Sequence, residues 1–382
     1  MSGNIRARDL GIGIGEGTPG PLNAITDVAG VRVGHTTLID GSGPLVVGRG
    51  PVRTGVTIVV PHEGDTWAEP VFAGTATMNG NGELTGLEWV REAGLLSGPI
   101  GITNTSAVGV VRDALVSSAT GSHDAGALHW SLPVAGETYD GRLNDIAGGH
   151  VRTEHVAAAL ASAQGGAVAE GNVGGGTGMI CHEFKGGIGT ASRRLPAAIG
   201  GWTVGVLVQA NYGRRGLLRV DGVPVGEEIP LTEVRSPWSE ERRGLADRGP
   251  GSGSIIGIVA TDAPLLPHQC ARLARRAPLG VARMGGMGST ASGDIFFCFA
   301  TGNRGMPPTE ADAEGDGVLT LRGLVDRALD PLIEATVEAT EEAILNALVA
   351  AETMTGRDGI TAHRLPHNRL VEVMRRHGRL RA

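Results

Sequence analysis

The chain has 382 residues, enough to bury a large core in one large domain or two modest ones. Hydrophobic residues make up 41% and charged residues 19%, which is typical of a globular protein and excludes a disordered one. The net charge is −7, and no cluster of Lys and Arg is interleaved with aromatic residues, which argues against nucleic acid as a partner.

The cysteines and the N-terminal sequence indicate whether the protein binds metal and in which compartment we expect it. The spacing of Cys181, Cys270 and Cys298 fits neither a zinc site nor a disulfide framework. We expect three buried, reduced thiols, no metal and no cofactor. The N-terminal sequence lacks the apolar core of a signal peptide, and no stretch approaches the roughly 18 apolar residues of a membrane span. We therefore expect a cytoplasmic protein without membrane contact.

Short apolar runs alternate with glycine turns in the first half of the chain and predict strands joined by tight turns. The predicted elements are, in chain order, strands at 31–39 and 55–62, a strand and then a helix within 98–115, a helix at 153–164, a strand at 202–213 and a hairpin at 216–226. Thr105 or Ser106 is expected to cap the first of these helices. The strand at 202–213 is apolar until it meets the polar Asn211.

The second half begins with a change of composition. Residues 227–253 are charged, contain proline and show no periodicity, so we expect an exposed loop. The elements predicted after it are a strand at 254–260, a helix at 266–277, a strand at 294–301, a long helical stretch at 323–352 and a helix at 366–377. Pro331 either starts the second half of the long stretch or kinks it. Mixed strands and helices predict an α/β or α+β protein.

The common motifs of nucleotide binding and hydrolysis are missing. Gly15, Gly17 and Gly20 match GxGxxG, but no strand precedes them and Pro19 lies within the motif. No Walker A loop, GxSxG elbow or HExxH sequence occurs. The chemistry therefore has to come from another arrangement.

A nucleophile uncovered by peptide-bond cleavage needs none of these motifs. The freed α-amine of a Ser, Thr or Cys has a pKa of about 7.7–8, so one residue supplies both nucleophile and general base. Such a site requires a cut in an accessible loop, a glycine before the cut and a rigid strand after it. Gly253 and Ser254 in "RGPGSGSIIGIVATDAP" (248–264) meet all three requirements. A serine at the start of a strand is common, so this pattern alone leaves a purely structural role open.

Long strings along nearly the whole chain carry a family resemblance. They are "ITDVAGVRVGH" (25–35), "NGNGELTG" (79–86), "ITNTSAVGVVRDA" (102–114), "PVAGETYDGRLND" (133–145), "GNVGGGTGMICHEFKGGIGTASR" (171–193), "VLVQANYG" (206–213), "GSGSIIGIVATDAPLLPHQ" (251–269) and "GSTASGDIFFCFATGN" (288–303). Together they resemble the family of L-aminopeptidase D-amidase/D-esterases and β-peptidyl aminopeptidases.

The resemblance implies a precursor that cleaves itself between Gly253 and Ser254 into chains of 253 and 129 residues that stay associated. It implies one domain over 1–382 with a four-layer αββα sandwich, similar to N-terminal-nucleophile hydrolases but with different connectivity. Residues 227–253 would form a flexible tail of the first chain, longer than the family leads us to expect. Homotetramers are implied as well.

The resemblance also implies roles for individual residues. Ser254 would attack the carbonyl of an N-terminal residue, Ser292 would bridge to the amine or oxygen of Ser254, and Asp294 would orient Ser292. Asn211 would stabilise the oxyanion. Two further residues, Glu137 and Tyr139, would line the substrate pocket, with Glu137 as counter-ion of the free ammonium group of the substrate.

Three functions follow from these residues. The first is an aminopeptidase acting on small peptides, amides or esters; the "ETY" string favours the L-α-amino acid and D-amide branch over the β-peptide branch. The second is acyl transfer, as in the similar ornithine acetyltransferases, but these use Thr where this chain has Ser254. The third is a binding protein without activity, which would remain uncut.

Overall fold

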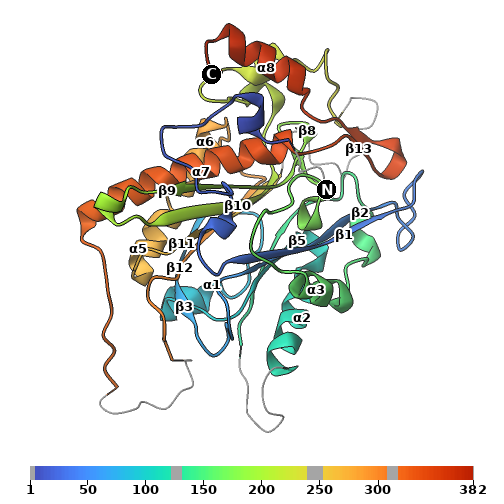
Figure 1. The fold of residues 1–382 in the computed structure, drawn as a ribbon. Helices are drawn as coiled ribbons and strands as arrows, with labels where there is room; N and C mark the ends of the chain where they lie inside the picture. Colours follow the sequence, from blue (N-terminus) through green and yellow to red (C-terminus); the bar gives the residue numbers. More distant parts are fainter. Residues whose placement is uncertain (1–4, 122–130, 239–252, 308–316, 382) are drawn as a thin grey trace.

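Two β-sheets pack face to face and carry helices on their outer sides, as expected for an αββα sandwich (Figure 1). The computed structural model describes residues 5–121, 131–238, 253–307 and 317–381. No helix in these ranges is both long enough and apolar enough to cross a membrane.

The strand order separates a smaller from a larger sheet. The smaller sheet has the order β1-β2-β5-β6, with β1 (Arg32–Asp40), β2 (Val52–Val60), β5 (Ile100–Asn104) and β6 (Val134–Thr138). The larger sheet has the order β4-β3-β12-β11-β10-β9, with β4 (Leu95–Leu96), β3 (Val71–Gly80), β12 (Gly293–Ala300), β11 (Ser254–Thr261), β10 (Thr203–Asn211) and β9 (Gly187–Arg194). Two short pairs complete the strands: β7 (Ile180–Cys181) with β8 (Phe184–Lys185), and β13 (Met354–Thr355) with β14 (Thr361–Ala362).

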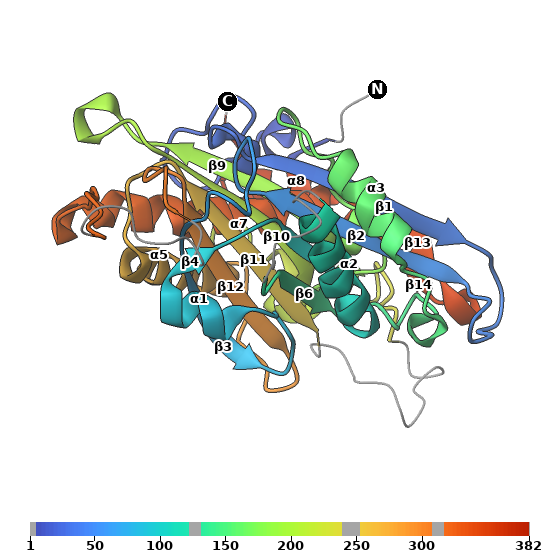
Figure 2. The same ribbon diagram turned by 90° about the horizontal axis from the view of Figure 1, so that it is seen from below.

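The helices cover the two outer faces (Figure 2). Helices α2 (Val108–Gly121) and α3 (Thr153–Ala161) pack on the smaller sheet, and α5 (Pro267–Ala274), α6 (Ala277–Arg283) and α7 (Asp330–Val349) pack on the larger one. The other helices are α1 (Leu87–Ala93), α4 (Val225–Glu228) and α8 (His367–Arg376). Pro331 lies in the first turn of α7, so it starts the helix and does not kink it.

One expected cap is wrong. Thr105 and Ser106 form a 3₁₀ turn before α2, and the side chain of Asn104 caps this turn by accepting a hydrogen bond from Ser106 N at 3.0 Å. An asparagine oxygen on the last residue of β5 reaches the turn's free amide as well as a hydroxyl does.

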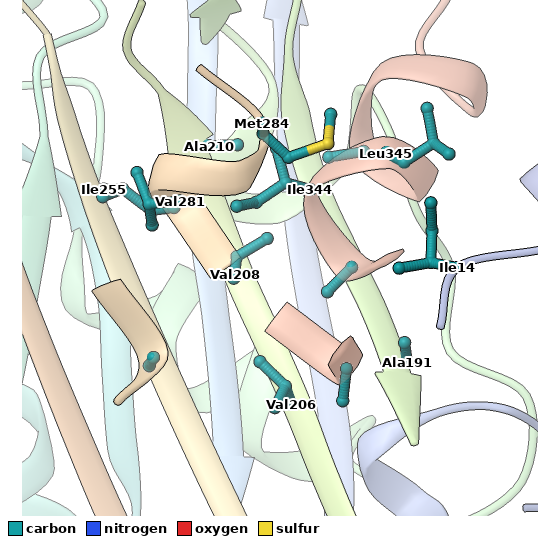
Figure 3. Packing of buried hydrophobic residues seen from close by; sticks show 14 of the residues in the cluster. Ile14, Ala191, Val206, Val208, Ala210, Ile255, Val281, Met284, Ile344 and Leu345 are labelled. Atoms are coloured by element: carbon teal, nitrogen blue, oxygen red, sulfur yellow. The ribbon is translucent and has the colours of Figure 1, made fainter. Parts of the chain in front are cut away.

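Alternation along the central strands decides which side chains face which core. Val206, Val208 and Ala210 of β10 pack against α6 and α7, and Figure 3 shows Val208 and Ala210 near Ile344. On β11, Ile256 and Ile258 face the other way, into the core between the sheets. Ser254 is two residues before Ile256 and four before Ile258, so its side chain projects from the same, inter-sheet face.

The three cysteines are free and buried, as expected. The hairpin expected at 216–226 is reduced to one bridge between Val220 and Val223, around Asp221 and Gly222 with φ of 48° and 79°. It is short because a 3₁₀ turn at Arg215–Leu217 and helix α4 occupy its flanks.

Residues 227–238, the first part of the segment for which we expect a flexible loop, are packed against the C-terminal helix. Glu228 pairs with Arg376 at 2.8 Å, and Glu233 pairs with Arg369 at 2.6 Å. The Arg215 guanidinium donates to the Val234 carbonyl at 3.0 Å. Residues 239–252, the rest of that segment, lie outside the described residues.

Candidate active site

Ser254 is the first residue of β11 and lies between two neighbouring strand ends. It pairs with Asn211 at the end of β10 and with Gly293 at the start of β12. All eight residues of β11 are buried, because an apolar, β-branched run fills a central strand well. Ser254 is 5% exposed, and its Oγ accepts a hydrogen bond from Gly293 N at 3.2 Å. The serine is therefore held rigidly at the edge of the larger sheet.

Gly253 has a steric reason to be glycine. A Cβ at this position would lie 1.7 Å from the backbone oxygen of Asn211, far inside van der Waals contact. Any side chain would push the Gly253–Ser254 peptide away from the strand end of β10. The close approach of the Asn211 oxygen therefore explains why a glycine precedes the proposed cut.

Asn211 is buried at the end of β10, where the chain turns through Gly213 with φ of 90°. Its Oδ1 accepts a hydrogen bond from Ile180 N at 2.8 Å, and its Nδ2 donates to the Tyr139 carbonyl at 2.9 Å. An amide nitrogen carries two hydrogens, so one N–H beyond the bond to Tyr139 can be offered to a ligand. The side chain is oriented for that task by two backbone groups.

Ser292 and Asp294 form a buried pair. Ser292 Oγ donates to Asp294 Oδ1 at 2.5 Å, and Asn79 Nδ2 donates to Asp294 Oδ2 at 2.8 Å. Burial raises the pKa of the Asp294 carboxyl above its ordinary value, and the hydrogen bonds from Ser292 and Asn79 oppose this. Their mutual contact agrees with the expectation that the two side chains share one face.

The structure does not bring Ser292 onto the Ser254 hydroxyl. Asp294 alternates with Phe296 and Cys298 on the helix-covered face, whereas Ser254 projects from the inter-sheet face. Within the described ranges, no hydrogen bond joins Ser254 to Ser292. Ser254 pairs with Gly293, which lies between Ser292 and Asp294 in the chain, so the two parts of the site adjoin at the strand ends.

Glu137, on β6 of the opposite sheet, approaches the same edge. It is 3% exposed, its Oε1 accepts from Glu83 N at 3.1 Å, and its Oε2 accepts from Thr105 Oγ1. A Cβ on Gly82 would lie 3.0 Å from Glu137 Oε1 and 2.9 Å from the Cα of Gly293. The carboxylate thus lies near the backbone that contacts Ser254, and Gly82 keeps the space between them open.

Tyr139 contacts the site through its backbone, and its place in the substrate pocket stays a prediction. Its backbone carbonyl accepts a hydrogen bond from Asn211, its ring folds over Gly141, and the residue as a whole is 37% exposed. Residues that the sequence argument did not single out also support the site: Asn79 on Asp294, Thr105 on Glu137, and the Ile180 amide on Asn211. Asn79 and Thr105 lie within the quoted strings "NGNGELTG" and "ITNTSAVGVVRDA", which was the available signal.

These features together define a class. A serine at the first position of a central strand, beside an amide donor and a buried hydroxyl–carboxylate pair, in an αββα sandwich, is the arrangement of a hydrolase with an N-terminal nucleophile. Residues 23–362 match the model of peptidase family S58. The chain belongs to this family, and its activity is that of an aminopeptidase, a hydrolase.

Relatives and solved structures agree along the whole chain. A β-peptidyl aminopeptidase, BapA, of Sphingosinicella microcystinivorans is 50% identical over 99% of this chain and 93% of its own length. The β-aminopeptidase of a Burkholderia species is 53% identical, with a TM-score of 0.89 over 98% of this chain and 99% of that one. An L-aminopeptidase D-Ala-esterase/amidase of Ochrobactrum anthropi, described as a variant of the Ntn hydrolase fold, is 42% identical, with a TM-score of 0.87 over 98% and 99%.

Proposed function

We propose that the chain cleaves itself between Gly253 and Ser254 and then uses the new terminus to remove N-terminal residues from small peptides. Ser254 Oγ attacks the scissile carbonyl, and the Ser254 α-amine takes up its proton. The free N–H of Asn211 stabilises the oxyanion. The leaving amine receives the proton, and water hydrolyses the acyl-enzyme. The placement of Ser254 between Asn211 and Gly293 is the observation that carries this proposal.

The proposed role of Ser292 and Asp294 follows from the two faces of the sheet. Because the Ser254 side chain and the Asp294 carboxylate project from opposite faces, Ser292 acts on the α-amine and not on the Ser254 hydroxyl. Asp294 fixes the Ser292 hydroxyl, and an ionised Asp294 favours the protonated amine during proton transfer. Ser292 and Asp294 therefore influence the Ser254 hydroxyl only through the α-amine at the start of β11.

We assign the substrate's ammonium group to Glu137. The carboxylate is buried and oriented by two donors, so the charge of an incoming ammonium group would be matched at low solvent exposure. A carboxylate there distinguishes a chain end from an internal peptide bond.

The substitution Glu137→Gln tests this assignment. It is expected to lower kcat/KM for a substrate with a free amine by about 100-fold, since a buried charge pair loses one partner. An ester of the same acid without its amino group should be hydrolysed equally by both proteins. Glu83→Gln is the matched control, because only the backbone of Glu83 contacts Glu137. An equal loss on both substrates would remove Glu137 from amine recognition.

We further propose that β-amino acid residues are preferred at the N-terminus of the substrate, in place of the L-α branch that the "ETY" string favours. The support is the order of identities: relatives named for β-peptides share 47–53% with this chain, and the L-aminopeptidase shares 42%. We expect kcat/KM for a β-homoalanine p-nitroanilide to exceed that of the alanine p-nitroanilide by at least about tenfold, the usual worth of one methylene in a pocket. A preference for the alanine compound would place the chain in the L-α branch.

The proposed chains, 1–253 and 254–382, share structure that would hold them together. Strand β10 of the first pairs with β11 of the second, and β3 of the first pairs with β12 of the second, all in one sheet. Arg193 of the first lies 2.8 Å from both Glu338 and Glu342 of the second, with all three side chains buried. These contacts support a processed protein whose chains stay associated. The family resemblance supports the further proposal of a homotetramer, which sedimentation would test.

A further inference from the structure

A cavity of about 210 Å³ adjoins the candidate site on the helix-covered side of the larger sheet. Ser292 and Asp294 form one wall, and Tyr212, Val281 of α6 and Met287 form others. Arg214 also lines it. The roles proposed above give the cavity no occupant, although Ser292 opens into it.

The direction of the scissile bond relates this cavity to the substrate. Ser254 Oγ and Glu137 lie on the inter-sheet side, so the amino end of the substrate occupies that side. The Ser254 α-amine passes its proton to the departing nitrogen in the proposed reaction, and Ser292, which acts on that amine, lies on the other side of the sheet edge. The leaving group is therefore directed away from Glu137 and into the cavity.

The polar groups of the cavity indicate which chemical group the leaving group should carry. The hydroxyl of Tyr212 is buried, and no described residue forms a hydrogen bond with it. The Arg214 guanidinium is exposed; its one described side-chain contact is with the thioether of Met287 at 3.5 Å, and no described carboxylate pairs with it. A guanidinium offers five donors in a planar fork that fits a carboxylate.

We propose that this cavity is the leaving-group subsite and that Arg214 binds the C-terminal carboxylate of a dipeptide substrate. This inference rests on the proposed function. Arg214 is then a specificity-determining residue, which favours short peptides with a free carboxyl end over the corresponding amides. In such a substrate the carboxylate lies one residue beyond the scissile bond, and a cavity of about 210 Å³ is of the size of one amino acid.

The test compares one dipeptide with its C-terminal amide, which has the same leaving group without the negative charge. Arg214→Gln is expected to raise KM for the free acid about tenfold, the lower end for a hydrogen bond to a charged group at an exposed site, and to leave KM for the amide unchanged. Arg214→Lys should restore part of the loss, since it keeps the charge without the fork. Arg327→Gln, an exposed arginine of the 3₁₀ turn Asp326–Leu329, serves as the matched control.

The possible results distinguish a wrong role for Arg214 from a wrong assignment of the Ser254 nucleophile. An equal rise of KM for acid and amide, or no change for either, would overturn the role of Arg214. Failure of the proposed function would show differently, as an uncut wild-type chain or as an active Ser254→Ala variant. A selective rise for the free acid supports the subsite.

Discussion

Replacing Ser254 with alanine is expected to leave one uncut chain of 382 residues and to lower kcat by about 10⁵-fold or more, the scale of losing a catalytic nucleophile. The hydroxyl is needed both to cleave the Gly253–Ser254 bond and to attack the substrate. The exchange removes one oxygen from a buried strand end, so the fold is expected to persist. Gel mobility, intact mass and peptide hydrolysis measure the result.

Ser252→Ala is the control for this experiment, because Ser252 precedes the proposed cut and β11 begins at Ser254. It should be processed and active like the wild type. A Ser254→Ala protein that is cut, or that keeps substantial activity, would contradict the assignment of the nucleophile.

Replacing Asn211 with aspartate is expected to lower kcat of the processed enzyme by about 100–1,000-fold, with a smaller change in KM, because an oxyanion donor acts mainly in the transition state. Aspartate keeps the oxygen that accepts from Ile180 N and loses the N–H groups. Active-site titration corrects kcat for the fraction of cleaved chains.

Asn211→Ala separates the two tasks of this side chain. It removes the contacts with Ile180 and Tyr139 as well as the donor, so it should also lower the melting temperature. An unchanged kcat in the aspartate variant would remove Asn211 from the oxyanion site.

The sequence alone carries much of the fold and part of the site. The apolar run after Ser254 predicts a buried strand, and the polar end of the preceding strand predicts a special role for Asn211. Both signals are local, because they depend on residues adjacent in the chain. The side-chain periodicity of two also predicts correctly that Ser292 and Asp294 meet.

Other parts of the site depend on contacts distant in sequence. Asn79 holds Asp294 because β3 pairs with β12, 215 positions along the chain, and no local pattern specifies that pairing. Nor does a local pattern show that Ser254 and Asp294 project from opposite faces of the sheet. Alternation within one strand does not determine how that strand is aligned with its neighbour.

The packed start of the segment after residue 226 illustrates the same limit. Its charged, irregular sequence is typical of an exposed loop, yet Glu228 and Glu233 pair with Arg376 and Arg369 of α8, more than a hundred residues later. Those acidic side chains have partners only once the C-terminal helix is in place. The composition of this segment therefore predicts that these side chains are exposed, but it does not predict their ion pairs with α8.

Intact-mass analysis of the wild-type protein, with N-terminal sequencing, tests self-processing most directly. Self-processing predicts two chains that co-purify, of 253 and 129 residues, the smaller beginning with Ser254. A single uncut chain of 382 residues that hydrolyses peptides at full rate would contradict it.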